Sequence, residues 1–173
     1  LLIVLAAVQR GPSVRFVKVE ELEQALEIAA SIQPTMLILD IEPWLVHWSE
    51  PTASLDEAAR AAVLTAAEGA HVILATNSRR FAVEQAGEVR LIRGAHKPWT
   101  RRSRLGNVGD RAVVVGDCVV TDGMLAWRLG GTFVYVPWHG ASPIWARILY
   151  ASDRILLRLM RQGAGSRLGF RGV

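Results

Sequence analysis

The amino-acid sequence predicts an α/β fold with a doubly wound parallel sheet. Short apolar runs recur along the chain without the polar alternation of half-exposed strands, and segments of helical periodicity separate them. Strands that are apolar on both faces are typical of parallel sheets covered by helices on both sides. The chain has 173 residues, 51% of them hydrophobic, which is enough for one sizeable core. We therefore expect a single domain over residues 1–173, without a large cap.

Each expected element has a local signal. Strands are short, wholly apolar runs, whereas helices have apolar residues three or four positions apart. Pro34 ends the first helix, and Ser54 with Glu57 forms a capping box for the next helix, which Gly69 ends. The expected strands are 36–40, 72–75, 89–92, 112–116 and 133–136. The expected helices are 20–32, 54–69, one beginning at Arg79, 119–129 and a long amphipathic helix at 144–161, before a flexible tail at 162–173.

The N-terminus and the cysteine content bear on the compartment. The opening LLIVLAAV is eight apolar residues, far short of the roughly 20 that span a bilayer. Without a basic leader or an initiator Met, it is expected to be an internal strand or helix of a truncated chain. Cys118 is the single cysteine, so no disulfide within the chain can form. We expect a cytoplasmic protein, with peripheral contact to the inner membrane face.

The positive charge is concentrated in the C-terminal part of the chain. The formal net charge is +4, but residues 143–173 hold six Arg against one Asp, which leaves the first 142 residues near −1. No zinc-finger, RNA-binding or basic-zipper pattern accompanies these arginines, so nucleic acid is not an expected partner. An anionic membrane surface is a better candidate.

Side chains that can act as nucleophiles, acids, bases or ligands follow four of the expected strands. Asp40 and Glu42 follow the first, Thr76, Asn77 and Ser78 the second, Lys97 the third, and Asp117 with Asp122 the fourth. Each residue alone is more simply explained as a turn former, a helix cap or a solvated charge. Because ligands of open α/β sheets bind at the carboxyl ends of the strands, the whole set predicts a functional site at that edge.

The order of these residues resembles that of the haloacid dehalogenase superfamily, in which an acid pair, a Thr or Ser, a Lys and a GDxxxxD motif follow successive strands. The stretches LILDIEPWLVHWSEP, VILATNS, AHKPWTR and VVVGDCVVTDGMLAWRLGG are similar to subclass III phosphatases of that superfamily, in particular the small phosphatidylglycerophosphate phosphatases of bacteria and mitochondria. The similarity covers about residues 21–161. Its most specific part is VVVGDCVVTDGMLAWRLG.

This resemblance implies an Mg²⁺-dependent phosphomonoester phosphatase that acts on a phosphorylated small molecule or a lipid head group such as phosphatidylglycerophosphate. Asp40 would be the nucleophile that forms an aspartyl-phosphate, and Glu42 would be the general acid and base. Lys97 would neutralise charge on the phosphate and the nucleophile, while Thr76 and Asn77 would help to bind the phosphate. The implied Mg²⁺ ligands are oxygen donors from Asp40, Glu42 through its backbone carbonyl, Asp117 and Asp122.

The first motif departs from the family pattern Asp-x-Asp-x-Thr, because the chain has Asp40-Ile41-Glu42-Pro43-Trp44. The extra methylene of Glu42 moves its carboxyl by about 1.5 Å, and a misplacement of about 1 Å can cost about 10²-fold in rate. Trp44 replaces a small hydroxyl residue, and Pro43 lacks a backbone N–H. The alternative is therefore a catalytically degenerate relative that acts as a binding or regulatory module.

The helix expected at 144–161 has two interpretations. Its apolar residues, among them Ile144, Ile148 and Ile155, recur at helical spacing, with arginines expected largely opposite them. We favour packing of this apolar stripe on the sheet, because the final helix of an α/β domain normally covers it. The arginines would then contact an anionic membrane. Trp138 and Trp145 flank the start of this helix, where either ordinary packing or a membrane interface would suit them.

Overall fold

The computed structural model describes residues 15–50, 63, 69–81, 85–86, 89–109 and 111–163. Three of the expected elements fall outside these ranges wholly or in large part. They are the element at the N-terminus, the helix at 54–69, of which residue 63 and the end are described, and the tail from residue 164 onward.

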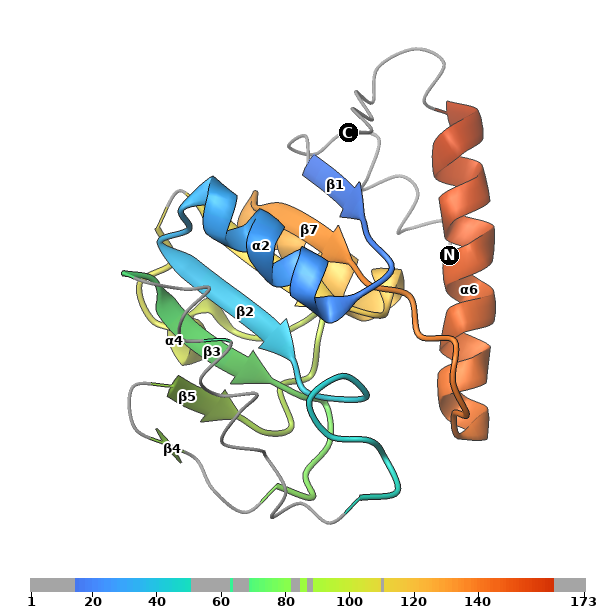
Figure 1. Ribbon diagram of the computed structural model, residues 1–173, viewed down its shortest axis with the longest axis horizontal. Coiled ribbons are helices and arrows are strands. Elements are labelled where there is room, and N and C mark those ends of the chain that lie inside the picture. The colour runs from blue at the N-terminus through green and yellow to red at the C-terminus, as the bar shows by residue number, and fades with distance from the viewer. Residues whose placement is uncertain are drawn as a thin grey trace.

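The described residues form one sheet in an α/β arrangement (Figure 1). All neighbouring strands are parallel except β4, which pairs antiparallel with β5 at one edge. The sheet order is β1-β7-β6-β2-β3-β5-β4. The strands are β1 (Arg15–Lys18), β2 (Met36–Asp40), β3 (His71–Ala75), β4 (Gln85–Ala86), β5 (Val89–Ile92), β6 (Ala112–Gly116) and β7 (Thr132–Tyr135).

The expected strands agree with the structure to within one residue at each end. β2, β5 and β6 have the expected bounds, β3 begins one residue earlier, and β7 is shifted by one residue. β1 and β4 were not expected, because neither has the continuous apolar run of a central strand. Both lie at the edges of the sheet.

The described helices largely follow the expected pattern. The first helix ends before Pro34, at Gln33 with a left-handed backbone. The element after β6 begins with a π-helical turn and continues as an α-helix, a detail that apolar spacing does not reveal. The helices are α2 (Leu22–Ile32), α4 (Arg102–Leu105), the π-helix η2 (Val119–Gly123), α5 (Met124–Leu129) and α6 (Ile144–Gly163).

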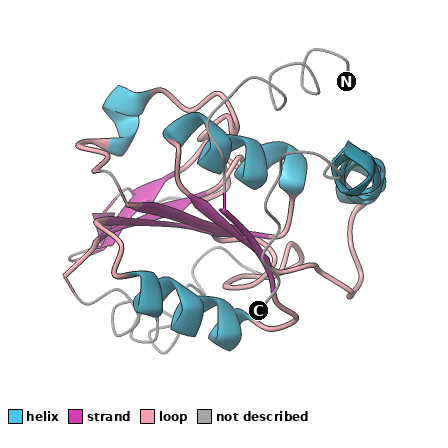
Figure 2. Ribbon diagram, turned by 90° about the horizontal axis from the view of Figure 1, so that it is seen from above, coloured by secondary structure: helices cyan, strands magenta, loops and turns pink. Residues whose placement is uncertain are grey.

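Helices cover both faces of the sheet, as Figure 2 shows. On one face, Ala25, Leu26 and Ala29 of α2 pack with Leu37, Leu39 and other inward side chains of the sheet. On the other face, α4, η2 and α5 contribute Leu105, Val119 and Leu125 to a second buried cluster, which contains Met36 and Ile38 of the same strand. Alternate residues of β2 thus enter different cores, which explains why the strand is apolar throughout.

No helix begins at Arg79 in the described part of this segment, because residues 77–81 are irregular. Side chains satisfy the backbone here in place of helical bonds. The Thr76 hydroxyl accepts a hydrogen bond from the Ser78 N–H, and the Ser78 hydroxyl accepts one from the Arg80 N–H. Such local bonds from Ser and Thr compete with helix formation, so the prediction was wrong.

α6 does not lie on a face of the sheet. In Figures 1 and 2 it stands beyond the carboxyl ends of the strands and crosses that edge. Ile144, Ile148 and Ile155, expected to pack on the sheet, are exposed, whereas Ala146, Asp153 and Leu156 are buried. The expected packing of the isoleucines is therefore wrong, and the helix turns its other side to the protein.

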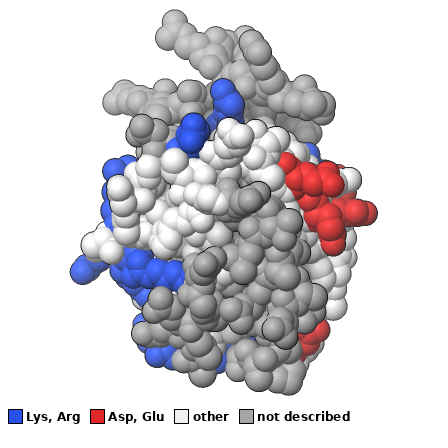
Figure 3. Space-filling model, turned by 60° about the vertical axis from the view of Figure 1, so that its left-hand side comes forward, with Lys and Arg blue, Asp and Glu red and all other residues white. Residues whose placement is uncertain are grey.

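Charged side chains are unevenly spread over the face in view in Figure 3. Lys and Arg side chains lie mainly along its left side and upper part, and acidic side chains lie mainly on its right. Among exposed acids, Glu21, Glu23 and Glu27 lie on or next to α2. In the described part of the chain, no helix has the length and apolar character needed to cross a membrane.

Candidate active site at the carboxyl edge of the sheet

The topology creates a crevice between β2 and β6. These strands are neighbours, but the chain passes from β2 toward β3 and from β6 toward β7, in opposite directions across the sheet. A crevice at such a switch point is the usual ligand site of an open α/β sheet. Asp40 is the last residue of β2, and Asp117 directly follows β6.

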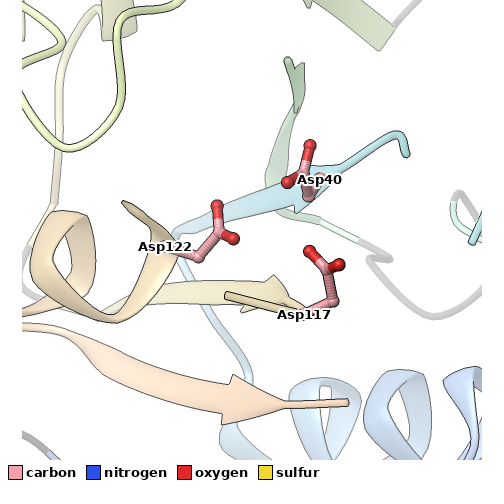
Figure 4. A group of neighbouring side chains, drawn as sticks. All are labelled: Asp40, Asp117 and Asp122. Carbon is pink, nitrogen blue, oxygen red and sulfur yellow. The ribbon is translucent and has the colours of Figure 1, made fainter. Parts of the chain in front are cut away.

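Three carboxylates meet at this crevice (Figure 4). Asp40 and Asp117 come from the two strand ends, and Asp122 comes from η2. One carboxylate oxygen from each residue lies within 4.8 Å of those of the other two. Gly116 makes this approach feasible, since a Cβ there would lie 2.5 Å from the Asp122 carboxyl carbon.

The Lys97 ammonium lies among these carboxylates. Its Nζ is 2.6 Å from Asp40 Oδ2 and 2.7 Å from Asp122 Oδ1. The Lys97 residue is only 5% exposed. Asn77 holds the Lys97 backbone, because its Oδ1 accepts a hydrogen bond from the Lys97 N–H and its Nδ2 donates one to the Lys97 carbonyl. The side chain of Asn77 therefore positions the lysine.

Burial and like charge perturb the acids of the site. Desolvation raises the pKa of Asp40 well above its usual range, although the Lys97 charge opposes this shift. Desolvation, with the Asp122 charge second, raises the pKa of Asp117 to about 7. Burial alone would lower the pKa of Lys97, but the charges of Asp122 and Asp40 outweigh it and raise that pKa. Perturbed groups of this kind concentrate at functional sites.

Both carboxylate oxygens of Glu42 have a partner. Its Oε2 accepts a hydrogen bond from the Thr76 hydroxyl at 2.9 Å, and its Oε1 lies 2.9 Å from Arg80 Nε. The Arg80 guanidinium also donates to the backbone carbonyls of His47, Trp48 and Glu50. Arg80 thus ties the segment after β2 to the segment after β3. No pattern in the sequence indicates this role of Arg80.

A cavity of about 300 Å³ opens at the site. Its polar wall contains Asp40, Glu42, Thr76, Asn77 and Asp117. Its apolar lining comes largely from Trp48 and α6. The lining residues from α6 are Trp145, Ala146, Leu149 and Tyr150.

α6 also contacts the strand-end loop directly. The Tyr150 hydroxyl donates a hydrogen bond to Asp117 Oδ2. The buried Asp153 carboxylate accepts hydrogen bonds from the N–H groups of Val119 and Val120 at 2.8 and 2.9 Å. These two residues fix the inner side of α6 to the start of η2.

Trp44 does not line the cavity. Its indole N–H donates to the Val136 carbonyl at 3.2 Å, and its ring meets Trp138 edge-on at 5.1 Å. Trp48 contacts both Trp138 and Trp145. The tryptophan that departs from the family pattern is therefore part of an aromatic cluster beside the site.

The structure brings together most of the residues that the strand ends predicted. Asp40, Lys97, Asp117 and Asp122 are in mutual contact or close to it, and Glu42, Thr76 and Asn77 line the same cavity. The sequence did not identify Arg80, Trp48, Leu149 or Tyr150. Helical periodicity places the last two on α6, but it does not reveal that α6 crosses the strand ends.

Comparisons with family models, with curated proteins and with solved structures found no match to this chain.

Proposed function

We propose that this chain is a phosphomonoester phosphatase of the haloacid dehalogenase type, which uses Asp40 as its nucleophile and Mg²⁺ as its cofactor. The observation that carries the proposal is the position of the Lys97 ammonium, 2.6 Å from Asp40 and 2.7 Å from Asp122, beside a third carboxylate at Asp117. A fixed cation beside a nucleophilic carboxylate is what attack on an anionic phosphate requires.

The chain's own residues would divide the reaction between them. Asp40 Oδ1 accepts a hydrogen bond from the Ile41 N–H, and Oδ2 faces Lys97, so the carboxylate is held in one orientation. In the proposed step, an Asp40 oxygen forms a bond to phosphorus as the ester oxygen leaves. Glu42, which must carry a proton for this step, gives it to that oxygen, and then takes a proton from the water that hydrolyses the aspartyl-phosphate.

The donor set suits Mg²⁺. Asp40, Asp117 and Asp122 offer carboxylate oxygens within 4.8 Å of one another, and hard divalent cations prefer such ligands. Three carboxylates and one ammonium leave a formal charge of −2, which one divalent cation balances. When bound, the cation would neutralise charge on the phosphoryl oxygens.

The cavity favours an amphiphilic substrate. Its carboxylates would take the phosphate with the cation, while Trp48, Trp145 and Leu149, which line the same cavity, would contact apolar groups. A volume of about 300 Å³ is at the small end of ligand pockets and fits a head group better than a whole lipid. We therefore propose a lipid head-group phosphate, such as that of phosphatidylglycerophosphate, as the substrate.

Phosphate release tests the proposed activity. Purified protein should release phosphate from an aryl phosphate and from phosphatidylglycerophosphate with Mg²⁺, and excess chelator should stop it. Asp40→Asn should lower kcat by at least about 10³-fold, since it removes the nucleophile. Glu27→Gln, which removes an exposed carboxylate on α2, is the control and should retain full activity. Equal turnover by the wild type and Asp40→Asn would contradict the proposal.

One observation favours the alternative of a non-catalytic binding module. The Thr76 hydroxyl donates to Glu42, and Arg80 Nε pairs with the same carboxylate, so Glu42 already engages the two groups that could otherwise bind a phosphate. The substitution Glu42→Asp distinguishes an active phosphatase from a binding module. It restores the shorter acid of the family pattern at this position and leaves the packing of Trp44 unchanged. A large gain in kcat would indicate a sound site with an impaired proton donor. No turnover by either protein, with Mg²⁺ still bound, would favour the binding module.

A further inference from the structure

The outer side of α6 carries an exposed apolar stripe. Ile144, Ile148 and Ile155 are 73%, 64% and 49% exposed, and Ala151 is also exposed. Successive residues turn by about 100° around a helix axis, which places these four within a sector of about 60°. We call this set the isoleucine stripe. Large aliphatic side chains that gather in solvent mark an interaction surface more often than isolated ones do.

Arginines border one side of the isoleucine stripe. Arg147, Arg154 and Arg158 are exposed, and the same helical geometry places them about 50–90° to one side of the centre of the stripe. They were expected opposite the apolar residues, so that expectation is corrected here. Asp153 is the single acidic residue of α6, and it is buried. The outer side of the helix is therefore apolar and cationic without an acid of its own.

The inner side of α6 is fixed, so the isoleucine stripe cannot turn inward. Asp153 accepts two backbone hydrogen bonds from η2, and Leu156 is 2% exposed within the second core cluster. Rotation of the helix to bury the isoleucines would expose Leu156 and break the Asp153 hydrogen bonds. The stripe is an outward surface of the folded chain.

We propose that the outer side of α6 docks on an anionic lipid bilayer. The isoleucine stripe would enter the boundary between head groups and acyl chains, while the flanking arginines would reach lipid phosphates at the same depth. Trp145, 53% exposed at the start of the helix, suits the head-group layer. The arginines decide between partners, since an apolar protein surface would leave three cations unneutralised whereas anionic lipid pairs with each of them.

Docking in this orientation would bring lipid head groups to the cavity. The first half of α6 has the isoleucine stripe on its outer side and cavity-lining residues on its inner side, among them Leu149 and Tyr150. One helix diameter, roughly 10 Å, separates the two sides. The docking itself does not depend on the proposed function. Only the idea that docking presents a lipid phosphate to Asp40 rests on the proposed function.

Vesicle co-sedimentation of the full chain tests the docking. Vesicles of equal parts phosphatidylglycerol and phosphatidylcholine should bind the protein, and pure phosphatidylcholine should bind it far less. Replacing Ile148 and Ile155 together by Ser should lower the partition coefficient at least about tenfold. Replacing Arg154 and Arg158 together by Gln should lower it about 25-fold at low salt, since each basic group contributes about fivefold. High salt should reduce the difference between wild type and the arginine variant.

Control variants distinguish a loss of docking through α6 from a general loss of positive charge and from a loss of catalysis. Arg101→Gln with Arg111→Gln removes two exposed arginines away from α6 and should retain most of the binding. The isoleucine variant should keep wild-type turnover of a soluble aryl phosphate, and Asp40→Asn should still bind vesicles. Far-ultraviolet circular dichroism confirms that each variant is folded.

Three results would overturn the docking proposal. The first is equal binding to neutral vesicles, and the second is no binding to either kind. The third is a dimer in sedimentation velocity that Ile148→Ser dissociates, which would assign the stripe to a second copy of the chain. Loss of turnover with intact vesicle binding would instead count against the proposed function alone.

Discussion

Burial and the charge of Asp122 destabilise the ionised forms of Asp40 and Asp117. Asp117 is buried, is close to Asp122 and has a pKa raised to about 7. An acid whose folded-state pKa is raised binds its proton more tightly in the native state, so its contribution to stability is present below about pH 4 and is lost as the pH rises through 7. Above pH 7, the metal-free protein therefore bears the cost of a buried charge.

Asp117→Asn should consequently have opposite effects with and without Mg²⁺. In chelator at pH 8, we expect the variant to be more stable than the wild type by about 1–4 kcal/mol, because it removes that charge. With millimolar Mg²⁺ the wild type should gain stability by binding the cation, whereas the variant should gain little. Urea denaturation under both conditions measures this. A variant that is less stable in chelator, or that responds to Mg²⁺ like the wild type, would contradict the expectation.

Asp153 gives a second pH dependence, next to the segment that carries Asp117 and Asp122. Burial raises its pKa to about 6, although the Val119 and Val120 N–H groups oppose the shift. The native state thus holds this proton more tightly than the unfolded chain, and stability from Asp153 is lost as the pH rises from about 4 through 6. Relative to Asp153→Asn, the wild type should lose about 1–3 kcal/mol between pH 4 and 7 in urea denaturation. A constant difference across that range would show that this pKa is not raised.

Among the helices and strands, α6 is the element whose orientation decides both the lining of the cavity and the exposed apolar surface. Leu156 and Ile155 are neighbours in sequence, but Leu156 is 2% exposed and Ile155 is 49% exposed. Leu156→Ala should cost about 2–4 kcal/mol because it leaves a cavity in the core. Ile155→Ala should cost less than about 1 kcal/mol. Thermal denaturation of the two variants compares them directly, and a larger loss from Ile155→Ala would place the opposite side of α6 against the protein.

The sequence predicts central strands better than it predicts the surroundings of α6. The expected bounds of β2, β5 and β6 match the structure because each is rich in apolar residues, with Arg90 as the exception within β5, and each lies next to residues that favour turns or loops. α6 has apolar residues on nearly every side. Its periodicity therefore predicts a helix, but it cannot decide between Ile155 and Leu156 as the buried residue. Contacts with η2 through Asp153 make that choice, and they join positions more than 30 residues apart.

At the scale of the whole molecule, the position of the site was predictable and its shape was not. The carboxyl ends of parallel strands share one edge, so acids and lysine that follow those strands were expected to meet there, and Asp40, Lys97, Asp117 and Asp122 do. The apolar wall of the cavity comes from Trp48 and α6. Its place depends on how the final helix crosses the sheet, which no local pattern specifies.

The proposed function requires an aspartyl-phosphate at Asp40, and chemical trapping would detect this intermediate. Protein mixed with Mg²⁺ and phosphatidylglycerophosphate, quenched in acid and reduced with borohydride, should carry homoserine in place of Asp40 when its peptides are analysed by mass spectrometry. Asp40→Asn supplies the control without a nucleophile. We predict reduction at Asp40 that requires both substrate and Mg²⁺. Phosphate release by the wild type with reduction at another carboxylate, or with none at Asp40, would contradict the account.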